Sequence, residues 1–391
     1  MNVSLFAGLD TDAAYSMSKY AVGLLEALQA EAETGTASAS SGERPLFTLH
    51  YGPGVRLPSP LGRSRRLTAL ANEGLATHVL YPRQARRLQG DVNHVLDHSY
   101  GSLLTALPGE RTIVTCHDLI PLRVPGIHPT LYSQMTGRRW YRRSVAAMTR
   151  AARIMAISEQ TRRDLIEHTG YDPERIVVIP HGIDRRFEPM ADGERKQQVR
   201  RGLGLPERGR LILHVGNCAP YKNLPALLQI LALLVQRSPE PVTLVRVGPP
   251  FTPAQSRLIV RLGLGERILR RERVSLEELV RLYHAADVLL FPSLYEGLGL
   301  PVAEALACGL PVVASNAASL PEVLGEGQLT FAPDDVEGMA EAVLAVWQNE
   351  TLRQELVEKG LRQARRFSWP RVAQQVLALY EEVWRDARPR S

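Results

Sequence analysis

The sequence is poor in cysteine and has no long apolar run. Its three cysteines, Cys116, Cys218 and Cys308, are widely spaced and odd in number, which argues against a disulfide framework and against a zinc site. No hydrophobic stretch approaches the roughly 20 residues of a membrane-spanning helix. The first residues, 1–7, carry no basic lead and too short an apolar core for a secretory signal. These absences favour a protein of the reducing cytoplasm.

Positive charge is unevenly distributed along the chain. The net charge is +6, and residues 56–89 contain seven arginines against one acidic residue, Glu73. A second basic cluster spans residues 138–153. Two interpretations stay open: these are solvated helix faces, or they attract an anionic partner such as a membrane leaflet, a lipid-linked acceptor or nucleic acid.

Strand-like apolar runs alternate with helical segments throughout the chain. This order predicts parallel sheets with crossover helices, and 391 residues are too many for one ordinary domain. An amphipathic helix is expected over residues 15–32 and a final helix over residues 369–385. The expected strands are 3–6, 46–50, 93–96, 112–116, 153–157 and 176–179 in the first half, and 211–215, 242–247, 288–291, 311–314 and 329–331 in the second.

A polar, irregular zone divides the chain into two α/β halves. We expect an N-terminal domain over residues 1–184, a linker over 185–209, a C-terminal domain over 210–366 and a terminal segment over 367–391. Ligands in open α/β sheets bind beyond the carboxyl ends of the strands. Two such halves therefore predict a ligand site in a cleft between them.

The turn between two of the expected strands has the chemistry of an anion site. Between the runs at 288–291 and 311–314, Glu296 and Glu304 stand eight residues apart around two glycines and a proline. Glycine lets a ligand approach the backbone, and proline suits a helix start, where free N–H groups and the helix dipole attract an anion. The residues around this predicted site are Gly297, Leu298, Gly299, Leu300, Pro301 and Glu304.

This stretch resembles the E-x7-E signature of the family 4 retaining glycosyltransferases, and the resemblance extends over residues 113–384. It implies the GT-B architecture, an α/β fold in which two Rossmann-like, doubly wound domains face a central cleft. It also implies that Glu296 is catalytic and holds the sugar hydroxyls beside the reacting carbon, and that Glu304 binds the ribose. In similar enzymes the terminal helix crosses back to the first domain.

A glycine and a lysine follow the first expected strand of the second half. The run 215–223 is similar to the family pattern V-G-x-x-x-P-R-K-N. The resemblance implies that Gly216, Asn217 and Lys222 border the donor diphosphate and that the lysine binds it. Many members have arginine where Asn217 stands, so the site lacks one cation unless another group substitutes. The resemblance also places Val274 at the nucleotide base.

Polar residues that end strands of the first half are candidates for the acceptor side. His117 and Asp118 end the run 112–116 and resemble the H-D-L motif of the family, which implies that His117 is catalytic and lies at the transferred sugar. Asp118 either fixes the tautomer of that histidine or caps a turn. His98 and Arg162 are further candidates on this side.

The loop after the first strand departs from the family. It has no glycine pair but carries Asp10 and Asp12 in a D-x-D spacing. In another glycosyltransferase fold this spacing binds a metal, but there it follows several strands rather than the first. We expect no metal site, and we expect these acids to cap a helix or contact acceptor hydroxyls.

The sequence therefore predicts an enzyme that transfers a hexose of the mannose or glucose type from a nucleotide-diphosphate sugar. GDP-mannose is favoured as donor over a UDP-sugar, and no cofactor is expected. The expected acceptor is a saccharide, a lipid-linked glycan or a small molecule, as in polysaccharide biosynthesis. Peripheral contact of the basic N-terminal half with the anionic inner face of a membrane is expected, whereas a nucleic-acid partner is not.

Two alternatives stay open at this point. One is a nucleotide-sugar epimerase of the same architecture, which would convert the donor without an acceptor. The other is an eroded transferase that only binds, for which salt-dependent binding to an anionic partner without sugar transfer would be evidence.

Overall fold

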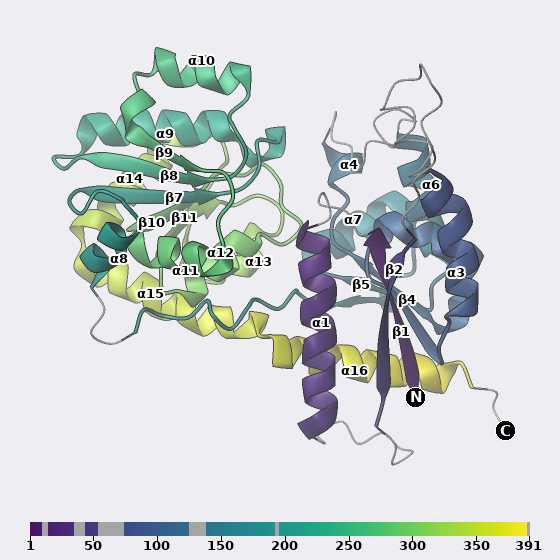
Figure 1. Cartoon of the computed structure of the whole chain (residues 1–391). Helices are drawn as coiled ribbons and strands as arrows, with labels where there is room; N and C mark the ends of the chain where they lie inside the picture. Colours follow the sequence, from purple (N-terminus) through teal and green to yellow (C-terminus); the bar gives the residue numbers. More distant parts are fainter. Residues whose placement is uncertain (10–14, 35–43, 54–73, 125–137, 192–194, 389–391) are drawn as a thin grey trace, which may run out of the picture. The chain divides into compact units, whose positions relative to one another are not determined.

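The computed structural model describes residues 1–9, 15–34, 44–53, 74–124, 138–191 and 195–388. The chain divides into two compact units (Figure 1). The first unit comprises Met1–Gly182 together with Trp369–Ser391, and the second comprises Ile183–Ser368. The terminal helix therefore belongs to the first unit although it follows the second in sequence.

A parallel sheet of six strands forms the centre of the described part of the first unit. The strand order is β2-β1-β3-β4-β5-β6. The chain moves from β1 outward to β2 and then returns to the other side of β1, so the direction of winding reverses between β1 and β3. The strands are β1 (Asn2–Leu9), β2 (Leu46–Gly52), β3 (Val92–Val95), β4 (Thr112–Cys116), β5 (Arg153–Ala156) and β6 (Ile176–Val178).

Alternating side chains of these strands build two cores, one on each face of the sheet. Val3 and Leu5 of β1 pack with helices α1 and α16, whereas Phe6 packs on the opposite face. Figure 1 shows α1 and α16 packed against each other. The helices are α1 (Tyr15–Thr34) and α16 (Trp369–Asp386) on the first face, α3 (Tyr81–Arg87), α6 (Arg138–Met148) and α7 (Glu159–Thr169) on the second, and α4 (Ile120–Arg123) after β4.

The second unit also has a six-stranded parallel sheet, in the order β12-β11-β10-β7-β8-β9. Here the winding reverses between β7 and β10. Helices α9 and α14 cover one face, and α11 and α12 lie on the other (Figure 1). The strands are β7 (Arg210–Val215), β8 (Val242–Val247), β9 (Ile268–Arg271), β10 (Val288–Phe291), β11 (Val312–Ser315) and β12 (Leu329–Phe331). The helices are α8 (Lys196–Gly202), α9 (Leu224–Arg237), α10 (Pro253–Arg261), α11 (Leu276–Ala285), α12 (Leu300–Ala307), α13 (Leu320–Leu324), α14 (Val336–Gln348) and α15 (Glu350–Ala364).

Every strand expected from the sequence is present, and one further strand was missed. Strand β9 (Ile268–Arg271) has only two apolar residues and lies at the edge of its sheet. Edge strands commonly carry charged residues, which hide the apolar signal of a strand. The segment 185–209, expected to be a linker, instead lies in the second unit and contains α8. Arg200 holds it there, because this buried side chain forms an ion pair of 2.7 Å with Asp287.

Replacing Gly23 of α1 by alanine should destabilise the first unit, although alanine ordinarily favours a helix by about 1 kcal/mol over glycine. A Cβ at Gly23 would lie 2.6 Å from Cζ2 of Trp369. Overpacking of this kind costs about 1–3 kcal/mol. Urea denaturation followed by circular dichroism measures the change. In a Trp369→Leu background, Gly23→Ala should become neutral or stabilising, and a similar loss in both backgrounds would contradict this contact.

Candidate functional site

A buried ion pair joins the two strands between which the second sheet reverses its winding. Lys222 follows β7, Glu296 follows β10, and the lysine Nζ lies 2.8 and 3.0 Å from the two carboxylate oxygens. The residues are 8% and 6% exposed, respectively. The ammonium also lies 5.4 Å from the ring centre of Tyr221 and 5.1 Å from that of Phe291. Ligands of open α/β sheets bind at such a reversal point.

Backbone contacts hold the two loops of this pair together. The amide of Leu294 donates to the carbonyl of Tyr221 at 2.7 Å. Asn223 adopts a left-handed conformation with φ of 53°, and its amide group donates to the carbonyl of Pro292 at 3.0 Å. The lysine loop and the glutamate loop are thus a single hydrogen-bonded assembly on rigid strands.

The second glutamate of the motif lies one turn inside α12. Gly299 precedes this helix with φ of 89°, and a Cβ there would lie 2.7 Å from a methyl group of Leu320, so the turn requires glycine. One carboxylate oxygen of Glu304 accepts a hydrogen bond of 2.6 Å from the hydroxyl of Tyr283. Burial, reinforced by the charge of Glu304, raises the pKa of Tyr283. The sequence had indicated the glutamate but not its tyrosine partner.

The remaining predicted donor residues surround the same edge of the sheet. Gly216 directly follows β7, and Val274 lies half-buried between β9 and α11. Asn217 is exposed and shapes its own turn, because its side-chain oxygen accepts from the amide of Ala219 at 3.0 Å. The glycine turn before α12 is buried; its predicted members are Gly297, Leu298 and Gly299, with Leu300 and Pro301 beginning the helix.

In the first unit, His117 lies in a buried cluster of histidines at the carboxyl ends of the strands. Its Nε2 lies 2.6 Å from the carbonyl of Leu96, and its Nδ1 lies 2.8 Å from Nε2 of His181. A carbonyl only accepts, so Nε2 of His117 carries the proton and Nδ1 accepts from His181. His98 uses Nε2 to contact the hydroxyl of Tyr141 at 2.7 Å. Both ring nitrogens of His117 are thus engaged inside the unit, and its contact with a transferred sugar stays a prediction.

Burial makes these histidines neutral. It lowers the pKa of His117 and of His181, and it lowers that of His98 to about 4 although Asp97 opposes the shift. It also lowers the pKa of His94 to about 3; this ring contacts the hydroxyls of Tyr380 and Thr115, at 2.7 Å each.

The other acceptor-side candidates serve local structure where they are described. Asp118 accepts from the amide of Ile120 at 3.0 Å and so caps a turn. The guanidinium of Arg162 donates to the carbonyl of Pro173 at 3.2 Å, and its place on the acceptor side stays a prediction. Asp10 and Asp12 lie outside the described residues. Within the described ranges, no three His, Cys, Asp or Glu side chains gather as a metal site.

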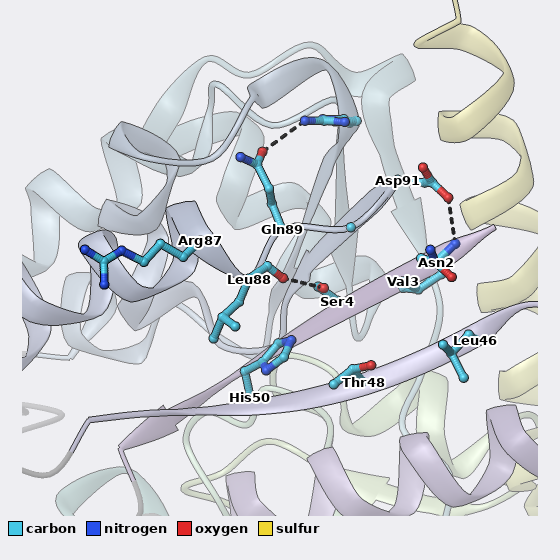
Figure 2. A pocket seen from close by; sticks show the side chains of 12 residues that line it. Asn2, Val3, Ser4, Leu46, Thr48, His50, Arg87, Leu88, Gln89 and Asp91 are labelled. Carbon is cyan, nitrogen blue, oxygen red and sulfur yellow. Dashed lines mark hydrogen bonds between the residues drawn. The ribbon is translucent and has the colours of Figure 1, made fainter.

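A cavity of about 550 Å³ opens at the opposite end of the first sheet, at the amino ends of β1 and β2 (Figure 2). Ser4 of β1 donates there to the carbonyl of Leu88 at 2.6 Å, and the amide of Asn2 donates to Asp91 at 2.7 Å. None of the predicted site residues lines this cavity. Ligand sites in α/β sheets lie at carboxyl ends, so we assign it no role.

The basic clusters are partly exposed and partly paired. Arg153 belongs to β5 and forms ion pairs with Glu382 and Asp386, so it contributes little free positive charge. No helix in the described ranges is both long and apolar enough to cross a bilayer. The exposed arginines of α3 and α6 are Arg83, Arg86, Arg87, Arg139, Arg142 and Arg143.

Two family models match the chain. The model described as "Glycosyl transferases group 1" matches residues 195–363, which carry Lys222, Glu296 and Glu304. The model described as "Glycosyltransferase Family 4" matches residues 17–187, which carry His117.

Two mannosyltransferases of Escherichia coli are among the curated relatives. The O-antigen chain mannosyltransferase B is 31% identical over 275 residues, which are 70% of this chain and 70% of the relative. The serotype-specific mannosyltransferase WbdA is 30% identical over 270 residues, which are 67% of this chain but 32% of the relative. The chain thus spans about a third of the length of WbdA.

A solved structure shares the fold. The crystal structure of Anabaena HepE in complex with UDP and glucose has a TM-score of 0.70 and covers 97% of this chain and 99% of its own, at 18% identity. At that identity the likeness shows the fold alone. With the two parallel sheets, it confirms the predicted GT-B architecture of two Rossmann-like domains.

Removing Lys222 should destabilise the second unit. In Lys222→Met the Glu296 carboxylate stays buried without its cation, and such a loss costs about 3–5 kcal/mol. Adding Glu296→Gln should restore most of the lost stability, as measured by urea denaturation at pH 7. Arg210→Met, which breaks a partly exposed pair with Glu240 in the same unit, should cost at most about 1 kcal/mol. Equal losses for Lys222→Met and Arg210→Met would contradict the burial of the pair.

Stability should fall as the pH decreases from about 6.5 towards 4. Each buried histidine has a lowered pKa, so the unfolded state binds its proton first, and each contributes up to about 1.4 kcal/mol per pH unit in this range. Urea denaturation at pH 7.5, 6.5 and 5.5 measures the slope. His94→Gln should flatten it, whereas the exposed His168→Gln should not. An unchanged slope in His94→Gln would show that this histidine is not held neutral.

Proposed function

The chain belongs to the family 4 glycosyltransferases, and from this we propose that it transfers a hexose from a nucleotide-diphosphate sugar to a glycan or lipid-linked acceptor with retention of configuration. One observation carries the proposal: the buried Lys222–Glu296 pair at the reversal point between β7 and β10. A donor bound there would meet a cation for its diphosphate, a carboxylate for its sugar and the amino end of α12.

The lysine is suited to binding the leaving diphosphate. In the absence of a ligand its charge is balanced by Glu296, at 2.8 and 3.0 Å. A diphosphate carries more negative charge than one carboxylate and would compete with it for the ammonium. Lys222 would then stabilise the charge that develops on the leaving group, an effect worth about 2.7–4 kcal/mol for one well-placed donor.

The two glutamates would divide the remaining donor contacts. Glu296, once the diphosphate takes its cation, is available to accept hydrogen bonds from hydroxyls of the transferred sugar. Glu304 is held by Tyr283 and would accept from the ribose hydroxyls. The amino end of α12 adds positive potential beside the diphosphate through the helix dipole.

The proposed reaction needs no metal, because Lys222 and the dipole at the amino end of α12 supply the positive charge. The bond from the anomeric carbon to the diphosphate breaks through an oxocarbenium-like transition state, as in other glycosyl transfers. The acceptor hydroxyl attacks from the same face, and the departing phosphate takes its proton. Retention of configuration follows from attack on that face.

A mannose-type donor is favoured by the two relatives named as mannosyltransferases. The HepE complex contains UDP, so UDP-sugars are the competing class. A thermal-shift panel of GDP, UDP, ADP and their hexose conjugates separates these classes. A ligand at about a hundred times its Kd adds about 2.7 kcal/mol of stability. A shift selective for GDP and GDP-mannose would support the proposed donor, and one selective for UDP would replace it.

The acceptor is proposed to be anionic or carried at an anionic surface. The exposed arginines of α3 and α6 support this, because clustered basic side chains near a leaflet contribute about 1 kcal/mol each. Peripheral contact of the first unit with an anionic membrane is part of the same proposal. Sedimentation with vesicles that contain acidic lipids, at low and high salt, tests it.

Three substitutions should each reduce transfer more than tenfold while the protein stays folded. Glu296→Gln and Glu304→Gln remove carboxylate acceptors, and Lys222→Arg keeps the charge but places it differently. Product formation from the donor that the panel identifies measures the effect. Glu358→Gln, an exposed substitution on α15, is the matched control and should leave activity unchanged. Near-normal transfer by Glu296→Gln would overturn the assigned role of this glutamate.

A further inference from the structure

Arg246 of β8 is a completely buried arginine without an acidic partner. Its side chain has 0% exposure, and among the described residues no carboxylate forms an ion pair with it. One terminal nitrogen donates to the carbonyl of Pro249 at 2.5 Å, and the other donates to the carbonyl of Gly216 at 3.1 Å and to Sγ of Cys218 at 3.0 Å. The Nε has no hydrogen-bond partner in the described ranges. The guanidinium also lies 4.6 Å from the ring centre of Phe251.

Such an arrangement is energetically costly. Burying a charge without a counter-charge costs several kcal/mol, and carbonyl dipoles and an aromatic ring offset only part of that cost. Burial accordingly lowers the pKa of Arg246, although contact with the Cys218 thiol opposes the shift. The fold retains this positive charge despite the energetic cost, which indicates that a bound ligand supplies the negative counter-charge.

Arg246, Lys222 and His214 lie around Gly216, where positive charges outnumber negative ones. His214 is its register partner on β7 and is fully buried, and burial together with the charges of Lys222 and Arg246 lowers its pKa to about 3. A Cβ at Gly216 would lie 3.4 Å from the lysine side chain and 3.5 Å from Nε2 of His214. Among these groups, Glu296 supplies one negative charge against the two positive charges of Lys222 and Arg246.

The hydrogen bond from Arg246 to the carbonyl of Gly216 also orients the loop at residues 216–218. In a trans peptide the C=O and the following N–H point in opposite directions. Because Arg246 draws the carbonyl of Gly216 inward, the N–H of Asn217 points to the other side of the loop. Arg246 therefore contributes both a positive potential beneath the loop and an N–H donor on its outer side.

We propose that Arg246 is the positioning residue for the diphosphate of the donor and replaces, from beneath the loop, the cation that is absent at Asn217. This inference rests on the proposed function for the identity of the donor, but the anion site itself does not. A diphosphate would contact Lys222 and the outer amides of Asn217 and Cys218, and it would balance the charge of the buried guanidinium.

Isothermal titration calorimetry of the full chain with inorganic pyrophosphate and with GDP tests the inference. Arg246→Met should weaken both ligands about tenfold or more, because it removes the positive potential beneath the loop and the donor that orients the carbonyl of Gly216. Arg270→Met removes a positive charge from the neighbouring strand, where Arg270 is exposed and paired with Glu272. This control should bind both ligands as the wild type does.

Two further readouts separate ligand positioning from a structural role. Arg246→Met should unfold close to the wild-type temperature without ligand, because relief of the cost of burying an unbalanced charge offsets the loss of the hydrogen bonds to the carbonyls of Gly216 and Pro249. It should lose the increase in unfolding temperature that pyrophosphate gives. In Arg246→Met/Asn217→Arg, the new cation should restore most of the affinity. If Arg246→Met does not fold, Arg246→Gln removes the charge more conservatively and carries the same expectation.

The outcomes distinguish this inference from the proposed function. Equal pyrophosphate affinity in wild type and Arg246→Met would overturn the inference, and so would a wild type that binds neither pyrophosphate nor GDP. Continued sugar transfer in that case would leave the proposed function standing. Arg246-dependent pyrophosphate binding supports the inference. If no nucleotide sugar is then consumed, the proposed function fails while the anion site remains.

Discussion

The buried ion pair between Lys222 and Glu296 is the interaction around which the second unit is organised. The two residues are 74 positions apart in sequence, yet they lie in contact because β7 and β10 are neighbours at the point where the sheet reverses its winding. The pairing of β7 with β10 brings the loops that follow these strands close together, but it does not itself connect the two loops. Hydrogen bonds from Leu294 and Asn223 connect the two loops, so this edge of the sheet is rigid.

Burial affects the charge of histidine and the charge of arginine differently. A histidine can lose its proton, and burial favours that loss in both units, at His214 as well as in the first unit. There it lets His117, His181 and His98 form a neutral hydrogen-bonded network. An arginine stays protonated near pH 7. In the second unit, Arg246 therefore keeps its charge although no carboxylate in the described part of the chain pairs with it, and the fold must tolerate this imbalance.

Sequence reasoning recovered what depends on local pattern and missed what depends on contacts between distant segments. The apolar runs predicted the strands and the parallel sheets, except for β9, whose arginines are tolerated only because it lies at an edge. Glu296 and Lys222 were each predicted, but their pairing was not. Tyr283 and Arg246 gave no signal, because a tyrosine in a helix and an arginine in a strand are ordinary until the structure shows what they touch.

The charge imbalance and the ion pair have a joint consequence. While no ligand is bound, Glu296 neutralises Lys222 and leaves Arg246 unbalanced. A diphosphate carries enough negative charge for both cations, so on the proposed function its binding would relieve the unbalanced arginine and free the glutamate at the same time. Binding of the donor diphosphate would then also release Glu296 from Lys222, so that its carboxylate can bind the sugar. Because Asn217 is uncharged, the buried Arg246 would supply the second positive charge beside the diphosphate.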